Sequence, residues 1–397
     1  MNKSINIKDL SLYSEKQTLA SEHKIVRNVD FFAIKSKITC IVGEETNIMT
    51  DFLKSMVNIN NLKRKTFNQM EIEDLVYKKP QDVNWSQIRG KYISYVESAA
   101  EKPLNPTRKI FQHFTDVMGY QKYNENKKQI INSRKDAKVE LRKYKRDNKN
   151  KKDKTYIKEV ESLKKECFYN TKSGYIIKYL SNILNDFIIT DIEKKLNGYS
   201  NKLSLLDTQK FLFALATLSK SKIIILNDPF NKLEAIDKAQ FLNLISAYNS
   251  KKEATIIIST KDMSSAALVS DYIYIMYAGK FIEHGNIKEI ISNAKHPYTW
   301  SLISSISNQD INAEIFESYS TVNDMSNLPL GDPYASRNPH ALKIDFTMEP
   351  PLFEVKENAH YAATWSLHPK YPKTKIPQSV KRNMDQLKGG QNVKNKQ

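Results

Sequence analysis

The chain has 397 residues, 40% of them hydrophobic, which is enough for one large or two ordinary domains with a buried core. No run approaches the roughly 18 apolar residues of a membrane-spanning helix, and the first residues lack the apolar segment of a signal peptide. The two cysteines are too few for a disulfide framework and do not have the spacing of a zinc site, which fits a reducing cytoplasm. The net charge of +18 indicates an anionic partner, such as nucleic acid, nucleotide or an acidic membrane surface, or a composition merely rich in Lys, Asn and Ile.

Three apolar runs in the first segment, about 1–118, predict β-strands. They cover residues 37–42 and 91–96, and more weakly 29–34. After the first strong run, apolar residues of 52–57 recur at a spacing that forms one face of a helix. A strand, a glycine turn and a helix therefore follow one another, in the order that a phosphate-binding loop requires.

The turn itself reads GEETNIMT, from Gly43 to Thr50. It has the frame of the phosphate-loop motif G-x-x-x-x-G-K-[ST], but Ile48 stands at the second glycine and Met49 at the lysine. By itself the stretch is equally compatible with an ordinary strand, turn and helix.

The composition changes over about 119–178. Residues 121–165 hold 17 Lys and Arg against 7 Asp and Glu, which is more than half of the net charge. The stretch predicts one or two long helices, inserted into the domain as a helical hairpin. It is either a site for anionic lipid headgroups or RNA, or a solvated insertion without a specific ligand.

From 179 to 295 an alternation of strands and helices returns. Continuous apolar runs over 221–228 and 253–260 are typical of buried parallel strands, and 271–285 predicts two strands around a turn. Helical stretches cover 207–220 and 235–248. The alternation predicts an α/β fold with a mainly parallel sheet covered on both faces.

After about residue 300 five prolines interrupt the pattern, which predicts a small irregular C-terminal domain over 301–375. The polar, lysine-rich residues 376–397 predict a disordered tail.

Several stretches resemble the ATP-binding subunits of oligopeptide ABC transporters. Residues 276–306 match their Met-Tyr-Ala-Gly turn, Glu-x-Gly and His-Pro-Tyr-Thr, the last at 296–299. Residues 85–96 and 104–110 look like the segment around their glutamine loop, and the tail and basic insertion look like forms from wall-less bacteria. The resemblance covers about 25–370. It implies a P-loop ABC-type ATPase domain over 1–300, with the basic insertion of 119–178 inside it.

The resemblance implies a set of residues at the ATP site. These are Gly43, Glu44, Glu45, Thr46, Asn47, Ile48, Met49 and Thr50 of the phosphate loop, with Glu97 and Asn227. Backbone N–H groups of such a loop bind phosphate, a lysine neutralises it, and a hydroxyl holds Mg²⁺. Met49 can neither donate nor carry charge, and Ile48 lacks the backbone freedom of glycine.

The family's magnesium aspartate corresponds to Asn227, and its catalytic glutamate to Asp228. A neutral amide holds Mg²⁺ less well, so Thr50 and Asn227 predict a weak metal site. Asp228 is one methylene shorter than glutamate, and a general base must reach the attacking water. A strand end with polar residues is the alternative interpretation.

The family signature, Leu-Ser-Gly-Gly-Gln, corresponds to Leu203, Ser204, Leu205, Leu206 and Asp207. Both glycines are leucines, and Asp207 adds negative charge, so a phosphate clamp is disfavoured. The alternative is a helix N-terminus that Ser204 caps.

Three further family positions are also changed. Lys261 stands at the switch histidine, where it can act only as a point charge. Glu97 stands at the glutamine-loop position, with Ser98 as the alternative. The dimer-contact loop reads Lys232, Leu233 and Glu234 instead of Ala-Leu-Asp.

Many relatives carry a cysteine cluster in the tail, and this tail has no cysteine, so we expect no iron–sulfur cluster. Three histidines, His340, His360 and His368, lie among aromatic residues and prolines. Packing or surface roles are favoured for them over a metal site.

Together these departures predict a catalytically impaired, ATP-binding-type subunit of a peptide importer. We expect ATP and Mg²⁺ to be bound weakly or not at all. The expected partners are a second ABC ATPase subunit and two transmembrane permease subunits, at the cytoplasmic side of the cell membrane. Anionic lipid is a further candidate partner through 121–165, and no specific nucleic acid is expected. The alternatives are a working ATPase with divergent motifs, and an RNA- or lipid-binding protein on an inactive ATPase scaffold.

Overall fold

The computed structural model describes residues 2–15, 22–97, 103–306 and 328–394. The chain forms two compact units. Unit 1 combines residues 1–99 with 220–397, and unit 2 comprises residues 100–219. The boundary between residues 219 and 220 lies at the end of the helix predicted over 207–220, just before the strand predicted over 221–228.

An eight-stranded sheet forms the centre of unit 1. Its order is β12-β13-β11-β10-β3-β9-β8-β7. The strands are β3 (Ile38–Val42), β7 (Ile93–Glu97), β8 (Ile223–Asn227), β9 (Thr255–Thr260), β10 (Tyr272–Tyr277), β11 (Lys280–Asn286), β12 (Phe353–Lys356) and β13 (His360–Ala362). The five strands from β10 to β7 are parallel, and the remaining pairs are antiparallel.

The sequence patterns explain the parallel core. Every residue of β3, β8, β9 and β10 is buried, as continuous apolar runs require when both faces of a sheet are covered. The predictions of a mainly parallel sheet and of two strands within 271–285 are confirmed.

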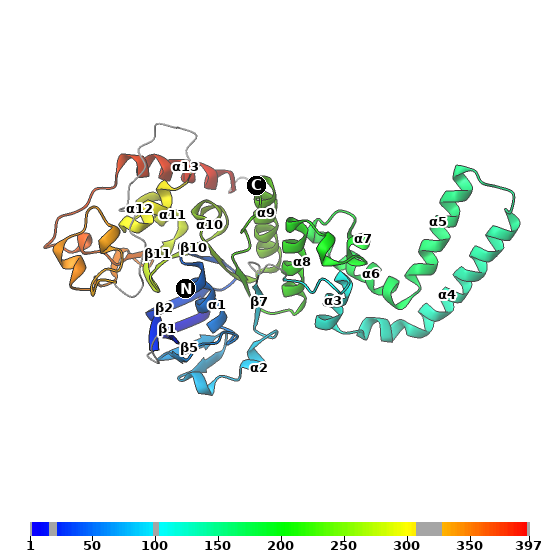
Figure 1. The fold of residues 1–397 in the computed structure, drawn as a ribbon, viewed down its shortest axis with the longest axis horizontal. Helices are drawn as coiled ribbons and strands as arrows, with labels where there is room; N and C mark the ends of the chain where they lie inside the picture. Colours follow the sequence, from blue (N-terminus) through cyan, green and yellow to red (C-terminus); the bar gives the residue numbers. More distant parts are fainter. Residues whose placement is uncertain (1, 16–21, 98–102, 307–327, 395–397) are drawn as a thin grey trace. The chain divides into compact units, whose positions relative to one another are not determined.

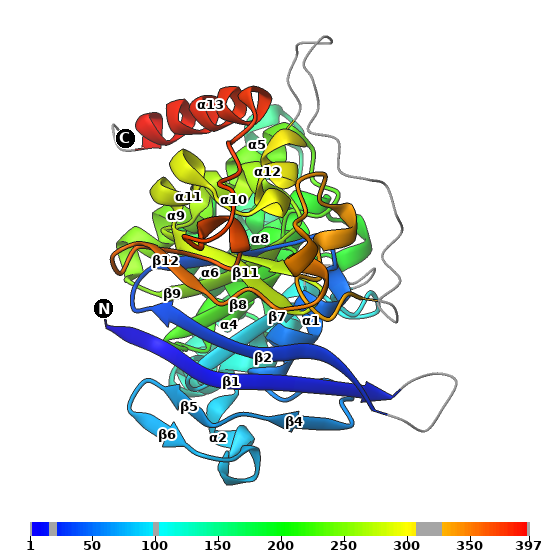
Figure 2. The same cartoon turned by 90° about the vertical axis from the view of Figure 1, so that its left-hand side faces the viewer.

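A second, antiparallel sheet of unit 1 has the order β2-β1-β5-β6, with β4 also paired to β1. Figure 2 shows the two long strands, β1 and β2, crossing the view above the shorter ones. The strands are β1 (Lys3–Glu15), β2 (Glu22–Ile34), β4 (Arg64–Thr66), β5 (Gln69–Ile72) and β6 (Leu75–Tyr77). Of this sheet, the sequence predicted only the last residues of β2.

The helices of unit 1 are α1 (Thr46–Ser55), α2 (Trp85–Ile88), α9 (Ala235–Lys252), α10 (Met263–Val269), α11 (Ile287–Asn293), α12 (Pro297–Ser304) and α13 (Gln378–Lys394). Helix α1 buries Phe52 and Leu53 in the core that also contains β2 and β5 residues. Its N-terminus follows β3 directly, so the strand–turn–helix prediction holds.

Helix α13 occupies the segment for which a disordered tail was expected. Its apolar residues Val380, Met384 and Leu387 are buried, at the i, i+4 and i+7 spacing of one helix face. The helix packs against α10, α11 and α12. The expectation of disorder overlooked this spacing because the surrounding residues are polar.

The segment expected as a separate C-terminal domain, 301–375, belongs to unit 1. It contributes β12 and β13 to the edge of the larger sheet, where β13 pairs with β11. It also contains the end of α12 and short 3₁₀ turns over Ala335–Arg337, Lys343–Phe346 and Trp365–Leu367.

Unit 2 is helical. Its helices are α3 (Ile110–Met118), α4 (Gln121–Asp147), α5 (Lys154–Tyr169), α6 (Lys172–Ile183), α7 (Ile192–Leu196) and α8 (Leu205–Leu218). Helices α4 and α5 form the hairpin predicted for the basic insertion, and Figure 1 shows them as the two longest helices of the unit. The helical unit extends beyond the predicted insertion of 119–178 on both sides.

None of the described helices is both long enough and apolar enough to cross a bilayer.

Candidate functional site

The predicted phosphate loop begins where β3 ends. A Cβ atom on Gly43 would lie 2.4 Å from the carbonyl oxygen of Met276 on β10, so only glycine fits at this point. Helix α1 starts at Thr46, three residues later, and Ile48 and Met49 belong to its first turn. Met49 is 1% exposed and packs in the apolar core. Residue 49 therefore acts as a core side chain, and its thioether brings no positive charge to the loop.

Three N–H groups of the loop donate to oxygens of the protein itself. The N–H of Thr46 donates to the carbonyl of Glu44 at 3.0 Å, and that of Met49 to the carbonyl of Glu45 at 3.2 Å. The N–H of Glu44 donates to the hydroxyl oxygen of Tyr298, on α12, at 2.9 Å. A phosphate would have to compete for these donors, because backbone N–H groups are what such a loop offers.

Two carboxylates flank the turn. Glu44 accepts from the guanidinium of Arg337 at 2.9 Å, and Glu45 accepts from the N–H of Ala278 at 2.7 Å. Burial raises the pKa of the Glu45 carboxyl, and the neighbouring Glu44 also contributes to this rise. Negative charge at residues 44 and 45 opposes a polyphosphate, and Arg337 offsets only part of it.

A hydrogen-bonded network joins three of the predicted site residues, all in unit 1. The amide Nδ2 of Asn227 donates to Thr50 Oγ1 at 2.9 Å and to Glu97 Oε1 at 2.7 Å. Its Oδ1 accepts from Ser259 Oγ at 2.7 Å. The orientation of the amide follows from Glu97, because an ionised carboxylate only accepts. Lys54 on α1 completes the network, with its ammonium nitrogen 2.7 Å from the second Glu97 oxygen.

This network does not fit a magnesium ion. Mg²⁺ takes oxygen ligands, whereas Asn227 donates from its amide nitrogen to Thr50 and Glu97, and its amide oxygen already accepts from the hydroxyls of Ser259 and Thr50. The only carboxylate of the group, on Glu97, is already neutralised by Lys54. The N–H groups of Asn227 and the ammonium of Lys54 thus provide the positive charge that a metal ion would otherwise provide to the oxygens of Thr50 and Glu97.

Asp228 follows β8 and is 7% exposed. Its φ of +48° is in the left-handed region, which aspartate tolerates better than most residues. Its N–H donates to the carbonyl of Ser259 at 3.0 Å, which fixes the backbone there. Burial raises the pKa of its carboxyl, while the positive charge of Lys261 opposes the rise. The two predicted catalytic positions, Asp228 and Lys261, are thus close enough for their charges to interact.

Asp262, next to Lys261, has a separate structural role. Its carboxylate caps α10 by accepting from the N–H groups of Ser264 and Ser265, and it pairs with Lys238 at 2.6 Å. Burial by itself would raise the pKa of Asp262, but these hydrogen bonds and the ion pair lower it. Lys261 itself is exposed at the end of β9.

The signature position lies in unit 2, where it forms the N-terminus of α8. The Ser204 hydroxyl accepts from the N–H of Asp207 at 3.1 Å, as an N-cap does. The Asp207 carboxylate pairs with Lys195 at 2.6 Å. Leu206 is buried and Leu205 is 40% exposed. The helix-terminus interpretation of this stretch therefore matches the geometry.

The remaining predicted positions have local roles. Ser98, the alternative glutamine-loop residue, lies outside the described residues, whereas Glu97 is the last residue of β7. In the segment predicted as a dimer-contact loop, Leu233 is buried and Glu234 directly precedes α9.

The three tail histidines differ in their surroundings. His360 is fully buried, and its Nε2 lies 2.7 Å from Glu283 Oε1. His368 packs on Trp365, with ring centroids 5.8 Å apart. His340 is exposed, and its N–H donates to Asn338.

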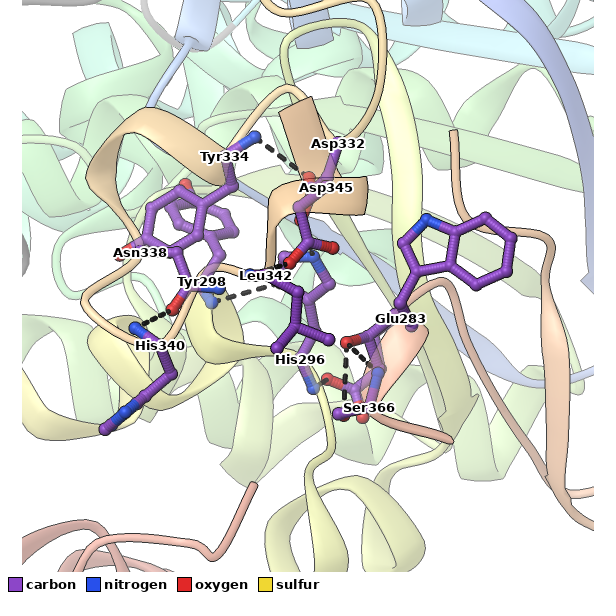
Figure 3. A network of polar contacts seen from close by, with 12 residues as sticks. Glu283, His296, Tyr298, Asp332, Tyr334, Asn338, His340, Leu342, Asp345 and Ser366 are labelled. Carbon is purple, nitrogen blue, oxygen red and sulfur yellow. Dashed lines mark hydrogen bonds and ion pairs between the residues drawn. The ribbon is translucent and has the colours of Figure 1, made fainter. Parts of the chain in front are cut away.

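A buried polar network, which no sequence pattern predicted, holds the C-terminal segment. Glu283 on β11 accepts from the backbone N–H groups of Lys295 and His296, which precede α12. Figure 3 shows His296 and Asp332 within this network. The Nε2 of His296 lies 3.3 Å from Asp332 Oδ2. The His-Pro-Tyr-Thr stretch is thus a helix start pinned by a buried carboxylate, and it presents Tyr298 to the phosphate loop.

The chain is similar in sequence to proteins of one transporter family. Residues 282–344 match the family model described as oligopeptide/dipeptide transporter, C-terminal region. The chain is 33% identical to the oligopeptide transport ATP-binding protein OppD of Mycoplasma genitalium, over 89% of this chain and 86% of that protein. It is also 33% identical to OppD of Mycoplasma pneumoniae, over 90% and 82% of the two chains, and 27% identical to OppD of Bacillus subtilis, over 96% and 94%. On this similarity, the chain belongs to the family of oligopeptide transport ATP-binding proteins of ABC transporters.

Proposed function

We propose that this chain is the ATP-binding-type subunit of an importer for oligopeptides, that its own nucleotide site is catalytically impaired, and that it serves as a structural and regulatory partner of a second ATPase subunit. The main observation in support of an impaired site is the hydrogen bonding of the Asn227 amide. It donates to both Thr50 and Glu97 where a magnesium site needs oxygen ligands.

The phosphate loop supports the same proposal. ATP hydrolysis depends on stabilising the charge that develops on phosphate oxygens. Here residue 49 is a buried methionine, and the N–H of Glu44 donates to Tyr298. The loss of a charge-assisted hydrogen bond to phosphate weakens binding by about 1.5–3 kcal/mol, which is the usual contribution of such bonds. The loss in turnover is expected to be larger, because that contact strengthens in the transition state.

The partners follow from the proposed role. Two ATP sites form between two such subunits, and each combines the phosphate loop of one subunit with the signature of the other. This chain weakens its own site at Met49 and the partner's site at Leu205 and Leu206. The assembly would bind two transmembrane permease subunits from the cytoplasmic side, so the chain would be a peripheral membrane protein.

The experiment is equilibrium binding of ATP to the isolated chain, with and without Mg²⁺. The proposal predicts weak binding that Mg²⁺ does not strengthen. The alternative of a working ATPase predicts saturable binding that depends on Mg²⁺, and that result would overturn the impaired site. Co-purification of the chain with the two permease subunits tests the structural role, which an RNA- or lipid-binding protein on an inactive scaffold does not predict.

A further inference from the structure

Helix α4 has most of its cations on one side. Lys128, Lys135 and Arg142 are spaced by seven residues, and so are Ile131, Lys138 and Lys145. Seven residues leave about 20° of rotation in an α-helix, so each series forms a line along the axis, and the two lines are neighbours. All six side chains are exposed. We call these six residues the α4 strip, and it runs about 26 Å along the helix at 1.5 Å per residue.

The acidic residues of α4 lie on a different face. They are Glu125, Asp136, Glu140 and Asp147, and at 100° per residue they point roughly 110–170° away from the centre of the α4 strip. The buried residues Ile130 and Ala137 occupy the third side. Within the described part of unit 2, the ion pairs of α4 are Lys122 with Glu125 and Arg146 with Asp147. Among these described residues, none of the five strip cations is in an ion pair, whereas Arg146, which points in the same direction as Lys128, is paired.

Helix α5 provides an internal comparison. Over Lys154–Tyr169 it has four lysines and three glutamates, so it is almost balanced. Its residues Val160 and Leu163 are buried, and the helix packs on both α4 and α6. The one-sided charge is therefore a property of α4, because α5 is also largely exposed but carries mixed charges.

The composition of the α4 strip favours lipid over nucleic acid. Ile131 is 41% exposed within the strip, and Val139 is 62% exposed at its edge. Apolar side chains between cations suit the boundary between headgroups and acyl chains. Binding of single-stranded nucleic acid relies on aromatic rings that stack on bases. The strip has no aromatic residue, and Tyr144 of α4 instead stacks on Tyr156 of α5, with ring centroids 5.9 Å apart.

We propose that the α4 strip lies against an anionic phospholipid surface and binds its phosphate and carboxylate headgroups. The inference rests on the proposed function, which brings the chain to the cytoplasmic side of a membrane. Each cation that reaches such a surface strengthens membrane binding about fivefold, and five cations lie on the strip. The attraction is screened by salt.

The test uses the full-length chain and vesicles, in a sedimentation assay at low salt. Wild-type chain should bind vesicles that contain phosphatidylserine and should not bind vesicles of phosphatidylcholine alone. The strip variant carries Lys135→Gln, Lys138→Gln and Arg142→Gln. The control variant carries Lys78→Gln, Lys79→Gln and Lys252→Gln, which removes the same net charge from exposed lysines outside the hairpin. Glutamine keeps helix propensity, and circular dichroism checks that the helices remain.

The strip variant should lose binding about 100-fold, from three cations at about fivefold each, while the control should lose less than about threefold. Equal losses in both variants would mean that net charge alone acts, and would overturn the inference. So would absence of wild-type binding to the anionic vesicles, or tighter strip-dependent binding to a single-stranded RNA than to the vesicles. The assay contains neither nucleotide nor permease, so its failure leaves the proposed transporter role untouched.

Discussion

The amide nitrogen of Asn227 lies 2.7 Å from Oε1 of Glu97, so a hydrogen bond joins the end of β8 to the end of the neighbouring strand β7. The family resemblance places an acid at residue 227 and an amide at residue 97, and this chain has the two exchanged. The exchange keeps one carboxylate in the group, but Lys54 neutralises it. We therefore attribute the expected loss of magnesium binding to this hydrogen bond and ion pair as well as to the missing aspartate.

Reversing the exchange should restore a metal response. In the variant Asn227→Asp with Glu97→Gln, residue 227 offers a carboxylate beside the Thr50 hydroxyl. We expect Mg²⁺ to strengthen ATP binding about tenfold or more, as one charge-assisted contact would. Titration with a fluorescent ATP analogue, with and without Mg²⁺, measures the change. The single variant Glu97→Gln is the control and should show no such response. A wild-type chain that already responds as strongly would contradict our interpretation.

The ion pair between Arg337 and Glu44 should couple the C-terminal segment to the phosphate loop. Glu44 is 45% exposed, so a double-mutant cycle of Arg337→Ala and Glu44→Ala should give only about 1 kcal/mol of coupling. Arg337→Ala alone should cost about 2 kcal/mol, because the guanidinium also packs over the rings of Tyr277 and Tyr334. Chemical denaturation measures both quantities.

Hydrogen exchange at residues 44–49 provides the control for that cycle. Exchange should rise in Arg337→Ala and less in Arg337→Lys, which keeps the charge. Unchanged exchange in both variants would show that the C-terminal segment does not hold the loop.

Lys65 should make the stability of unit 1 depend on pH. Burial, with the nearby positive charge of Arg89, lowers the pKa of its ammonium to about 7. The unfolded chain has the ordinary value near 10.5, so between these pH values the folded state binds fewer protons, and the free energy of unfolding rises with pH. The penalty for burying the charge is fully present below pH 7. Lys65→Met should remove this rise, so its effect on the free energy of unfolding should differ between pH 6 and pH 9.

Denaturation at pH 6 and pH 9 tests the role of Lys65. The control Lys78→Met changes an exposed lysine and should leave the pH dependence as it is. If the difference between wild type and Lys65→Met is the same at both pH values, the lysine is not held in its neutral form by the fold.

The Ser204 hydroxyl should matter for stability and not for turnover. Because it caps α8, Ser204→Ala should lower the free energy of unfolding by about 1 kcal/mol, and Ser204→Asp should retain most of the stability. The ATPase rate of the assembled subunit pair should stay within about twofold once both proteins are fully folded. A large loss of rate in Ser204→Ala, at a temperature where it is folded, would instead indicate a working phosphate clamp.

The sequence predicted the parts of the fold that depend on local pattern. Continuous apolar runs located β8 and β9. Strand β1 was missed because its alternation breaks at Asp9, where φ is +57° and the pairing with β2 shifts register between Ile7 and Leu10. A bulge of this kind interrupts the period of two on which strand prediction relies.

The sequence predicted which residues belong to the site but not how their side chains contact one another. The resemblance placed Thr50, Glu97 and Asn227 at one site, and the structure brings them together. Nothing in the sequence indicates that Tyr298 reaches the N–H of Glu44, since this contact joins segments 254 residues apart. The burial of Met49 likewise depends on packing against neighbouring elements, which no local pattern records.

The central claim is that this chain contributes no catalysis of its own to the transporter. The measurement that tests it most directly is the rate of ATP hydrolysis by the purified subunit pair, with Asp228→Ala in this chain. The matched control removes the corresponding carboxylate of the partner subunit and should abolish turnover. Our account predicts that Asp228→Ala leaves the rate within about twofold of wild type, since a base contributes about 10²–10⁴-fold only where it acts. Loss of turnover on Asp228→Ala, in a pair that still assembles, would show that this chain is a working ATPase.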